Sequence, residues 1–145
     1  MTDTPTPPVF GMPLRGILLL AGVYTFIWGA FFKWFGPTVL GWMASESVLN
    51  SIASTNAFGT FGMLIGFLIF LSAFYPFSWV YLIGLGIVGK LVSLAWFVLA
   101  YSDVVTWNKR SFFYLIANDL IWIIPLAIIG YKALQGRRYL ATLEK

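Results

Sequence analysis

Apolar residues form four long runs along this chain, and polar residues gather between the runs and at the two ends. The runs cover residues 14–35, 57–74, 78–101 and 112–131. A helix that crosses the hydrocarbon core of a bilayer, about 30 Å thick, needs roughly 20 predominantly apolar residues. Each run is close to that length. The pattern therefore predicts an all-α fold, an integral membrane four-helix bundle.

The segments outside these runs differ from them in composition. Residues 1–13 are rich in Pro and Thr, which predicts a disordered N-terminal tail. The first run is too long for the apolar core of a signal peptide, so we interpret it as a retained span. Residues 14–133 then form one four-span domain, and residues 134–145 form a basic cytoplasmic tail.

The connection between the first two runs, residues 36–56, is long for a helical bundle. Ser45 is a suitable N-cap residue, and Val48, Leu49 and Ile52 follow it at the spacing of one helical face. This pattern predicts a short amphipathic helix that lies on the membrane surface.

The composition supports a membrane location. Hydrophobic residues make up 60% of the chain and charged residues 10%, against about a quarter charged in soluble domains. The net charge is +4, but the basic residues lie at the ends of apolar runs and form no stripe interleaved with aromatics. We therefore expect contact with lipid headgroups and not with nucleic acid. Arg15 and Lys33 are 18 residues apart, about 27 Å along a helix, which suits interfacial anchors at opposite faces of the bilayer.

The distribution of Lys and Arg also predicts an orientation. With both termini inside, five basic residues lie inside and three outside, and the positive-inside rule then favours a multi-pass protein that is N-in and C-in. The inside set is Arg15, Lys132, Arg137, Arg138 and Lys145, and the outside set is Lys33, Lys109 and Arg110.

Two absences limit the chemistry of this chain. It has no cysteine and no histidine, which excludes thiol nucleophiles, haem held by histidine and the usual zinc sites. Its five acidic residues are scattered, so we predict neither a metal site nor a cofactor. Catalysis would depend on one Asp and one Lys, and the sequence therefore favours a non-catalytic role.

One pair of polar residues interrupts the fourth run. Asn118 and Asp119 lie inside residues 112–131, where an Asp near the centre of a span costs roughly 2.5 to 3.5 kcal/mol on insertion scales. Lys90 is 12 residues from the start of the third run, and Asp119 is 12 residues from the end of the fourth. Because consecutive spans run antiparallel, the two side chains share one level of the bilayer. We predict a Lys90–Asp119 ion pair within a buried polar site that includes Asn118.

The neighbours of this pair are candidates for the lining of a cavity. Gly86 and Ser93 lie within one helical turn of Lys90, so they offer space and a hydroxyl group. Trp122 is one turn from Asp119, and Trp28 lies well inside the first span.

Pro125 adds a further polar group at this level of the bilayer. It has no N–H, so it cannot bond to the carbonyl of Ile121. The freed carbonyl would be another acceptor near the pair.

Three interpretations of the polar site stay open. The pair is a structural lock between helices, as intramembrane charges often are. Alternatively it serves proton passage or binds a small polar ligand or headgroup. In the third interpretation the span borders differ from those drawn here, and each charge extends separately toward the interface.

Several short motifs resemble those of a group of small uncharacterised bacterial four-span membrane proteins. They are Gly22-Val23-Tyr24 with Trp28-Gly29, Gly62-Met63 with Gly66, Gly89-Lys90, and Asn118-Asp119-Leu120-Ile121-Trp122 with Pro125. The resemblance implies the same fold and the same polar site in a bacterial inner membrane. Members are sometimes labelled alkyl hydroperoxide reductase, but that chemistry needs a thiolate, which this chain lacks. A more distant resemblance is to DoxX-like membrane proteins, through a glycine-rich first span that ends in Lys33.

Three classes of function follow from these observations. The first is a non-catalytic accessory, scaffolding or small-ligand-binding membrane component. The second is a small transporter or proton-coupled carrier, and the third is a quinone- or lipid-linked membrane enzyme. Expected partners are the lipid bilayer and either other membrane-protein subunits or a second copy of the chain.

Overall fold

The computed structural model describes residues 9–44, 52–103, 105 and 107–144, and for residues 52–54 it describes the backbone alone. The described residues contain helices and no strand. The helices are α1 (Met12–Ala44), α2 (Ile52–Ser72), α3 (Val80–Tyr101), α4 (Lys109–Leu115), the π-helical turn η1 (Ile116–Leu120) and α5 (Ile121–Leu143).

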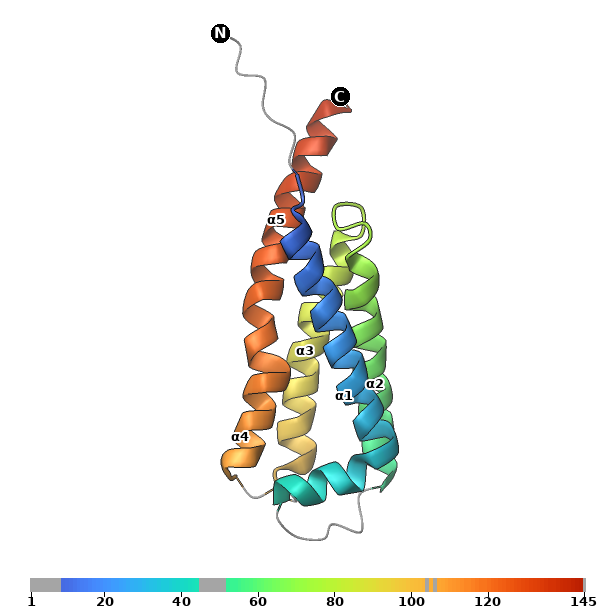
Figure 1. Cartoon of the computed structure of the whole chain (residues 1–145), viewed down its shortest axis with the longest axis vertical. Coiled ribbons are helices and arrows are strands. Elements are labelled where there is room, and N and C mark those ends of the chain that lie inside the picture. The colour runs from blue at the N-terminus through green and yellow to red at the C-terminus, as the bar shows by residue number, and fades with distance from the viewer. Residues whose placement is uncertain (1–8, 45–51, 104, 106, 145) are drawn as a thin grey trace.

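Four helical stretches are long and apolar enough to cross a membrane, with α4, η1 and α5 forming one of them. The chain therefore has the all-α four-helix architecture that the hydropathy pattern predicts. The helices lie side by side in one elongated bundle, with the start of α1 and the end of α5 toward the same end of it (Figure 1). A chain that crosses a bilayer four times returns to the side from which it started.

The first helix bends sharply at the residue where the sequence predicts the first span to end. Phe35 has φ −125° and ψ 24°, outside the helical region, and Pro37 lies two residues further on. Proline is tolerated in the first turn of a helix but breaks one in its interior, so the segment after the bend starts a new direction. That segment, residues 36–44, runs across the end of the bundle (Figure 1).

Helices α1 and α2 pack along a seam made of glycines from both. The glycine seam consists of Gly22, Gly29 and Gly36 of α1 and Gly59, Gly62 and Gly66 of α2. A Cβ atom on Gly29 would overlap the backbone nitrogen of Met63 and lie 2.8 Å from the carbonyl oxygen of Gly59. The two backbones approach closely because neither carries side chains here. The α2 glycines therefore serve helix packing.

The buried apolar residues form two clusters, one toward each end of the bundle. The first includes Leu18, Ile69, Ile83 and Leu126. The second includes Phe32, Phe58, Phe97, Tyr101 and Tyr114. On α1, on α3 and on the α4–η1–α5 stretch, a buried polar residue lies between members of the two clusters: Thr25, Lys90 with Ser93, and Asn118 with Asp119. The core is thus divided by a polar layer, defined by these five residues.

Two predictions concern segments outside the spans. Residues 134–143, assigned to a separate tail, continue α5 without a break, and the end of α5 extends beyond the bundle (Figure 1). Most of the amphipathic helix predicted after Ser45 lies outside the described residues.

Candidate functional site: a buried polar layer

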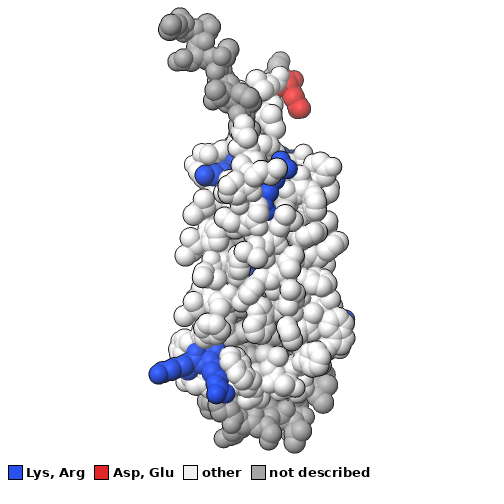
Figure 2. Space-filling model, in the orientation of Figure 1, with Lys and Arg blue, Asp and Glu red and all other residues white. Residues whose placement is uncertain are grey.

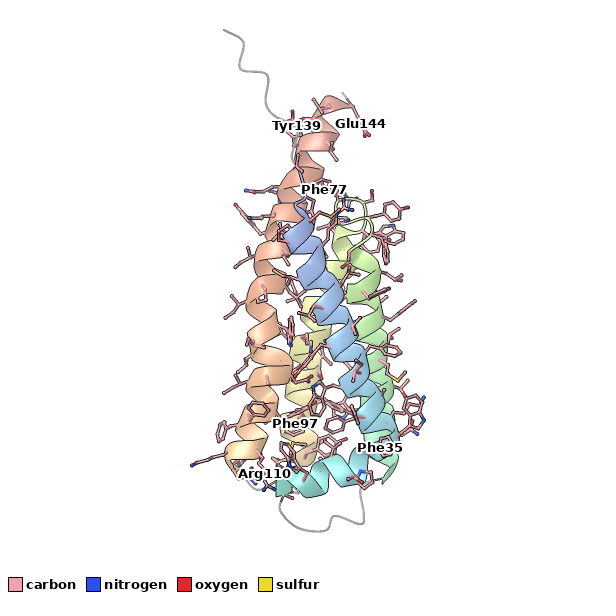
Figure 3. All side chains as sticks on the ribbon, in the orientation of Figure 1. Phe35, Phe77, Phe97, Arg110, Tyr139 and Glu144 are labelled. Carbon is pink, nitrogen blue, oxygen red and sulfur yellow. The ribbon has the colours of Figure 1, made fainter. Side chains whose placement is uncertain are left out.

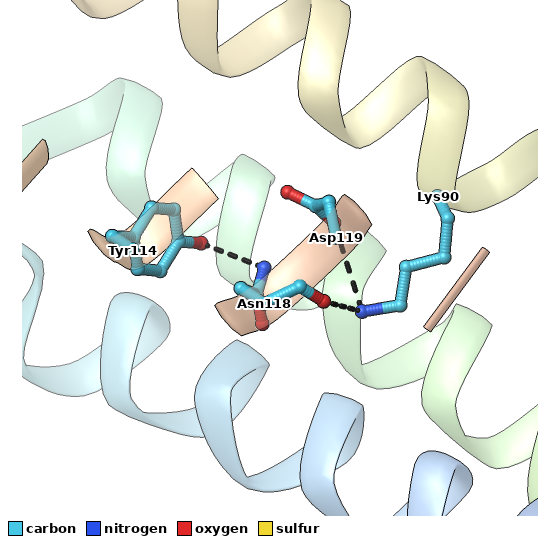
Figure 4. Close-up of polar contacts among 4 residues, drawn as sticks. All are labelled: Lys90, Tyr114, Asn118 and Asp119. Carbon is cyan, nitrogen blue, oxygen red and sulfur yellow. Dashed lines mark hydrogen bonds and ion pairs between the residues drawn. The ribbon is translucent and has the colours of Figure 1, made fainter. Parts of the chain in front are cut away.

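The polar layer brings together the charges that the sequence predicts to meet. Lys90 on α3 and Asp119 in η1 are 1% and 0% exposed, and Lys90 Nζ lies 3.6 Å from Asp119 Oδ1. The predicted ion pair is therefore present, and it joins the third and fourth spans. Figure 4 shows the lysine side chain extending from α3 toward the turn that carries Asn118 and Asp119.

The lysine makes its shortest polar contact with the backbone and not with the carboxylate. Lys90 Nζ donates a hydrogen bond to the Asn118 carbonyl oxygen over 2.5 Å (Figure 4). One ammonium group therefore binds a carbonyl and a carboxylate from adjacent residues. A buried charge is tolerated when it is both paired and hydrogen-bonded, and Lys90 meets both conditions.

The π-helical turn explains why a backbone carbonyl is available there. In η1 the N–H of Ile121 bonds to the carbonyl of Ile116, five residues earlier, instead of four. Such a shift changes the hydrogen-bond register of the helix, and single π turns occur frequently at functional sites. Asn118 and Asp119 are consecutive, yet both are buried in this turn. The extra acceptor was predicted at the carbonyl of Ile121, one turn before Pro125, whereas the acceptor that Lys90 uses is the carbonyl of Asn118.

The side chain of Asn118 is bound by a tyrosine that was not among the predicted site residues. The Nδ2 of Asn118 donates to the hydroxyl oxygen of Tyr114 over 3.0 Å, and both residues are buried (Figure 4). Tyr114 lies four residues before Asn118, so the helical i, i+4 rule would have identified it. This bond holds the side-chain amide of Asn118 in place. The backbone carbonyl of the same residue accepts the hydrogen bond from Lys90.

A small cavity of about 20 Å³ lies beside these groups. Its lining includes Thr25, Lys90, Ser93 and Asn118 from the polar layer, together with Trp28. A cavity needs roughly 10 to 15 Å³ to hold one water molecule. The space is therefore enough for a molecule the size of water and too small for an organic ligand.

Of the four residues predicted to line a cavity, two do so and two pack elsewhere. Trp28 and Ser93 line the small cavity. The space over Gly86 is taken by Ile69 of α2, whose Cγ1 lies 2.5 Å from where a Cβ would be. Trp122 packs on Tyr24, with ring centroids 5.2 Å apart. The glycine on α3 thus admits an apolar side chain from α2 and gives no room to the lysine.

Several buried polar atoms of the layer make no hydrogen bond to any described residue. They are Thr25 Oγ1, Asn118 Oδ1, both carboxylate oxygens of Asp119 and, next to the layer, Trp122 Nε1. All but one of these atoms can accept a hydrogen bond. The layer therefore has more acceptors than Lys90 alone supplies with donors.

The two predicted anchors lie on α1 at opposite sides of the polar layer. Lys33 Nζ lies 5.7 Å from the centre of the Trp34 ring, a cation–π contact. Arg15 is partly buried near the start of the helix. On the face that Figure 2 shows, the large areas of Lys and Arg lie toward the two ends of the bundle.

The described residues contain no group of three or more acidic, histidine or cysteine side chains that could hold a metal ion. What the polar layer can do chemically is limited to holding charge, exchanging a proton at Asp119 and hydrogen bonding. Comparison with protein-family models, curated proteins and solved structures finds no match for this chain.

Proposed function

We propose that this chain is a non-catalytic accessory or scaffolding component of a bacterial inner membrane, with both termini in the cytoplasm. In this proposal the Lys90–Asp119 pair joins the third and fourth spans, and the assembled bundle presents its lipid-facing surface to other subunits or to a second copy. The motifs that resemble those of the small four-span group include Lys90 and Asp119, which is consistent with a common structural task.

One observation carries the proposal. Both charges are at most 1% exposed, and the cavity beside them has a volume of about 20 Å³. A substrate site or solute path needs a concave space that admits the ligand, typically 300 Å³ or more. A closed layer of this kind suits a joint between helices better than a passage or an active site.

A second function, proton-coupled transport, is favoured by one specific feature. Neither carboxylate oxygen of Asp119 accepts a hydrogen bond from a described residue, and the carboxylate lies in a π-helical turn. Intramembrane acids with spare acceptor capacity are common in proton relays. Water would have to reach Asp119 through a change in the packing of the bundle.

Proton flux in liposomes distinguishes the two functions. The full chain is reconstituted with a pH-sensitive dye inside the vesicles, beside an Asp119→Asn variant and protein-free vesicles. If the pair is a joint, wild-type and variant vesicles dissipate an imposed pH gradient at the rate of protein-free vesicles. A faster rate in the wild type that Asp119→Asn abolishes would overturn the proposal and establish the carrier.

A further inference from the structure

An apolar hollow lies on α1 alone, where the helix bends. It has a volume of about 480 Å³ and is lined by Trp28, Phe31, Phe35, Thr38, Val39 and Trp42. This size is typical of pockets that hold small molecules. We call it the kink groove.

The bend at Phe35 creates the groove. Trp28, Phe31 and Phe35 follow the i, i+3, i+7 spacing of one face of the membrane-spanning part of α1. Val39 and Trp42 belong to the segment after the bend, which turns across the end of the bundle. Figure 3 labels Phe35 near the bend and Arg110 near the opposite end of that segment. The groove is the inner side of the corner between the two parts.

Apolar character alone does not select an occupant here. Phe31, Phe35 and Trp42 are about half exposed, but in a bilayer their surroundings are acyl chains, which are as apolar as the side chains. Specific binding therefore requires a concave shape and a polar group that recognises the headgroup.

Arg110 supplies that polar group at one end of the groove. Its Cζ lies 5.6 Å from the centre of the Trp42 ring, and its Nη1 donates to the Trp42 carbonyl oxygen over 2.9 Å. These contacts hold the guanidinium against the groove and use one of its five N–H donors in that hydrogen bond. Lys109, next to it, is exposed as well. A guanidinium held in place beside an ammonium is suited to a phosphate group.

We propose that the kink groove binds one acyl chain of an anionic phospholipid, whose phosphate lies at Arg110 and Lys109. The dimensions agree with this placement. Trp28 is seven residues before Phe35, so the groove extends about 10 Å from the bend into a leaflet about 15 Å deep. The chain end of the lipid lies on Trp28, which also lines the small cavity of the polar layer.

This site is separate from the joint proposed above, and it adds a ligand to the structural role. The joint is made by Lys90, Asp119 and the Asn118 carbonyl, and none of these residues lines the kink groove. Loss of lipid binding and loss of the joint are therefore measured independently, the first as lipid retention and the second as unfolding of the bundle.

Native mass spectrometry of the full chain in a mild detergent tests the proposal. The probes are dioleoyl phosphatidylglycerol and dioleoyl phosphatidylcholine, which share their acyl chains and differ in net charge. We expect retention of the anionic lipid over the zwitterionic one by fivefold or more, since a basic residue near anionic lipid contributes about a factor of five. Arg110→Gln lowers this preference about fivefold, and Arg110→Lys restores most of it.

Two filling variants and two matched controls separate the groove from general lipid contact. Thr38→Phe and Val39→Trp each place bulk in the groove and lower retention of both lipids, while the thermal unfolding midpoint confirms a folded bundle. Arg137→Gln removes an exposed charge near the end of α5, and Val23→Trp fills a different hollow of about 210 Å³ between α1 and α2. Both controls leave the preference unchanged.

Three results would overturn the proposal. They are equal retention of the two lipids by the wild type, an unchanged preference in Arg110→Gln, and displacement of the anionic lipid by an uncharged long-chain quinone at equal concentration. The last result would assign the groove to a neutral isoprenoid ligand instead.

Discussion

The two helix pairs of this bundle are held by opposite means. Helices α1 and α2 meet along the glycine seam, where every seam glycine except Gly36 lies against backbone atoms of the other helix. Helix α3 and the η1 turn meet through Lys90 and Asp119, a buried ion pair 3.6 Å long. The seam forms because its glycines have no side chains. The joint forms because Lys90 and Asp119 carry opposite charges.

The two interfaces should therefore tolerate different substitutions. At Gly22, Gly29, Gly59 and Gly66 a Cβ atom would overlap backbone atoms of the other helix, so these positions should reject an added carbon whatever the charges nearby. The joint should reject the loss of one charge but accept the loss of both, because two apolar side chains of similar size avoid an uncompensated buried ion. Substitutions at the joint and at the seam should therefore differ in their effect on the stability of the bundle.

Removal of one partner of the joint should have the largest effect. Lys90→Leu or Asp119→Leu alone should lower the free energy of unfolding by about 3 to 5 kcal/mol, because the remaining charge is buried without its partner. The double variant should recover most of this loss. Unfolding in detergent, followed by circular dichroism, measures all three proteins. Single variants as stable as the wild type would show that the pair is no joint.

A methyl group in the glycine seam should have the next largest effect. Gly29→Ala places a Cβ against the backbone of Met63 and Gly59, which cannot move aside as a side chain can. We expect a loss of about 1 to 3 kcal/mol, the usual cost of overpacking. Gly16→Ala on the same helix is the matched control, because no atom lies within 4 Å of its Cβ position. Equal unfolding midpoints for the two variants would contradict the seam.

Substitution on α3 should produce a smaller loss, since a side chain fills the space there. In Gly86→Ala the new Cβ meets Cγ1 of Ile69 at 2.5 Å, and this side chain can shift. We expect a loss of about 1 kcal/mol, and a combined loss with Ile69→Ala, which removes Cγ1, that is smaller than the sum of the two single losses. Gly84→Ala, which meets no atom within 4 Å, should be neutral or slightly stabilising. A double-mutant cycle on unfolding midpoints measures the coupling, and additive effects would argue against this contact.

The sequence was sufficient for the number of spans and for the pairing of the two charges. Hydropathy determined the first, because a bilayer imposes a minimum apolar length. The second followed from counting equal distances from the span borders to Lys90 and Asp119. Both arguments use one-dimensional spacing, which helical geometry converts directly into depth.

Other features of the site depend on tertiary packing and were not predicted. Thr25 belongs to the polar layer because of the rotation of α1 about its axis, which the glycine seam determines. The π-helical turn has no hydropathy signature, so the Asn118 carbonyl was not foreseen as the acceptor for Lys90. The bend at Phe35 is a different case. The Gly36-Pro37 pair that follows it is a recognised breaker of helices, and the sequence could have indicated it.

The bond between Tyr114 and Asn118 should contribute the smallest of these effects. Tyr114→Phe removes the hydroxyl that accepts from Asn118 Nδ2 and leaves the aromatic packing in place. Hydrogen bonds between side chains in membrane proteins contribute about 0.6 kcal/mol on average, so the unfolding midpoint should fall only slightly. Tyr131→Phe, at an exposed position of α5, is the matched control and should show no change. The decisive measurement is a double-mutant cycle of Tyr114→Phe with Asn118→Ala. If Tyr114 holds the amide of Asn118, the losses of stability in the two single variants are less than additive in the double variant. If the losses add, the tyrosine stabilises the bundle through its ring alone, and Lys90 is held without the tyrosine hydroxyl.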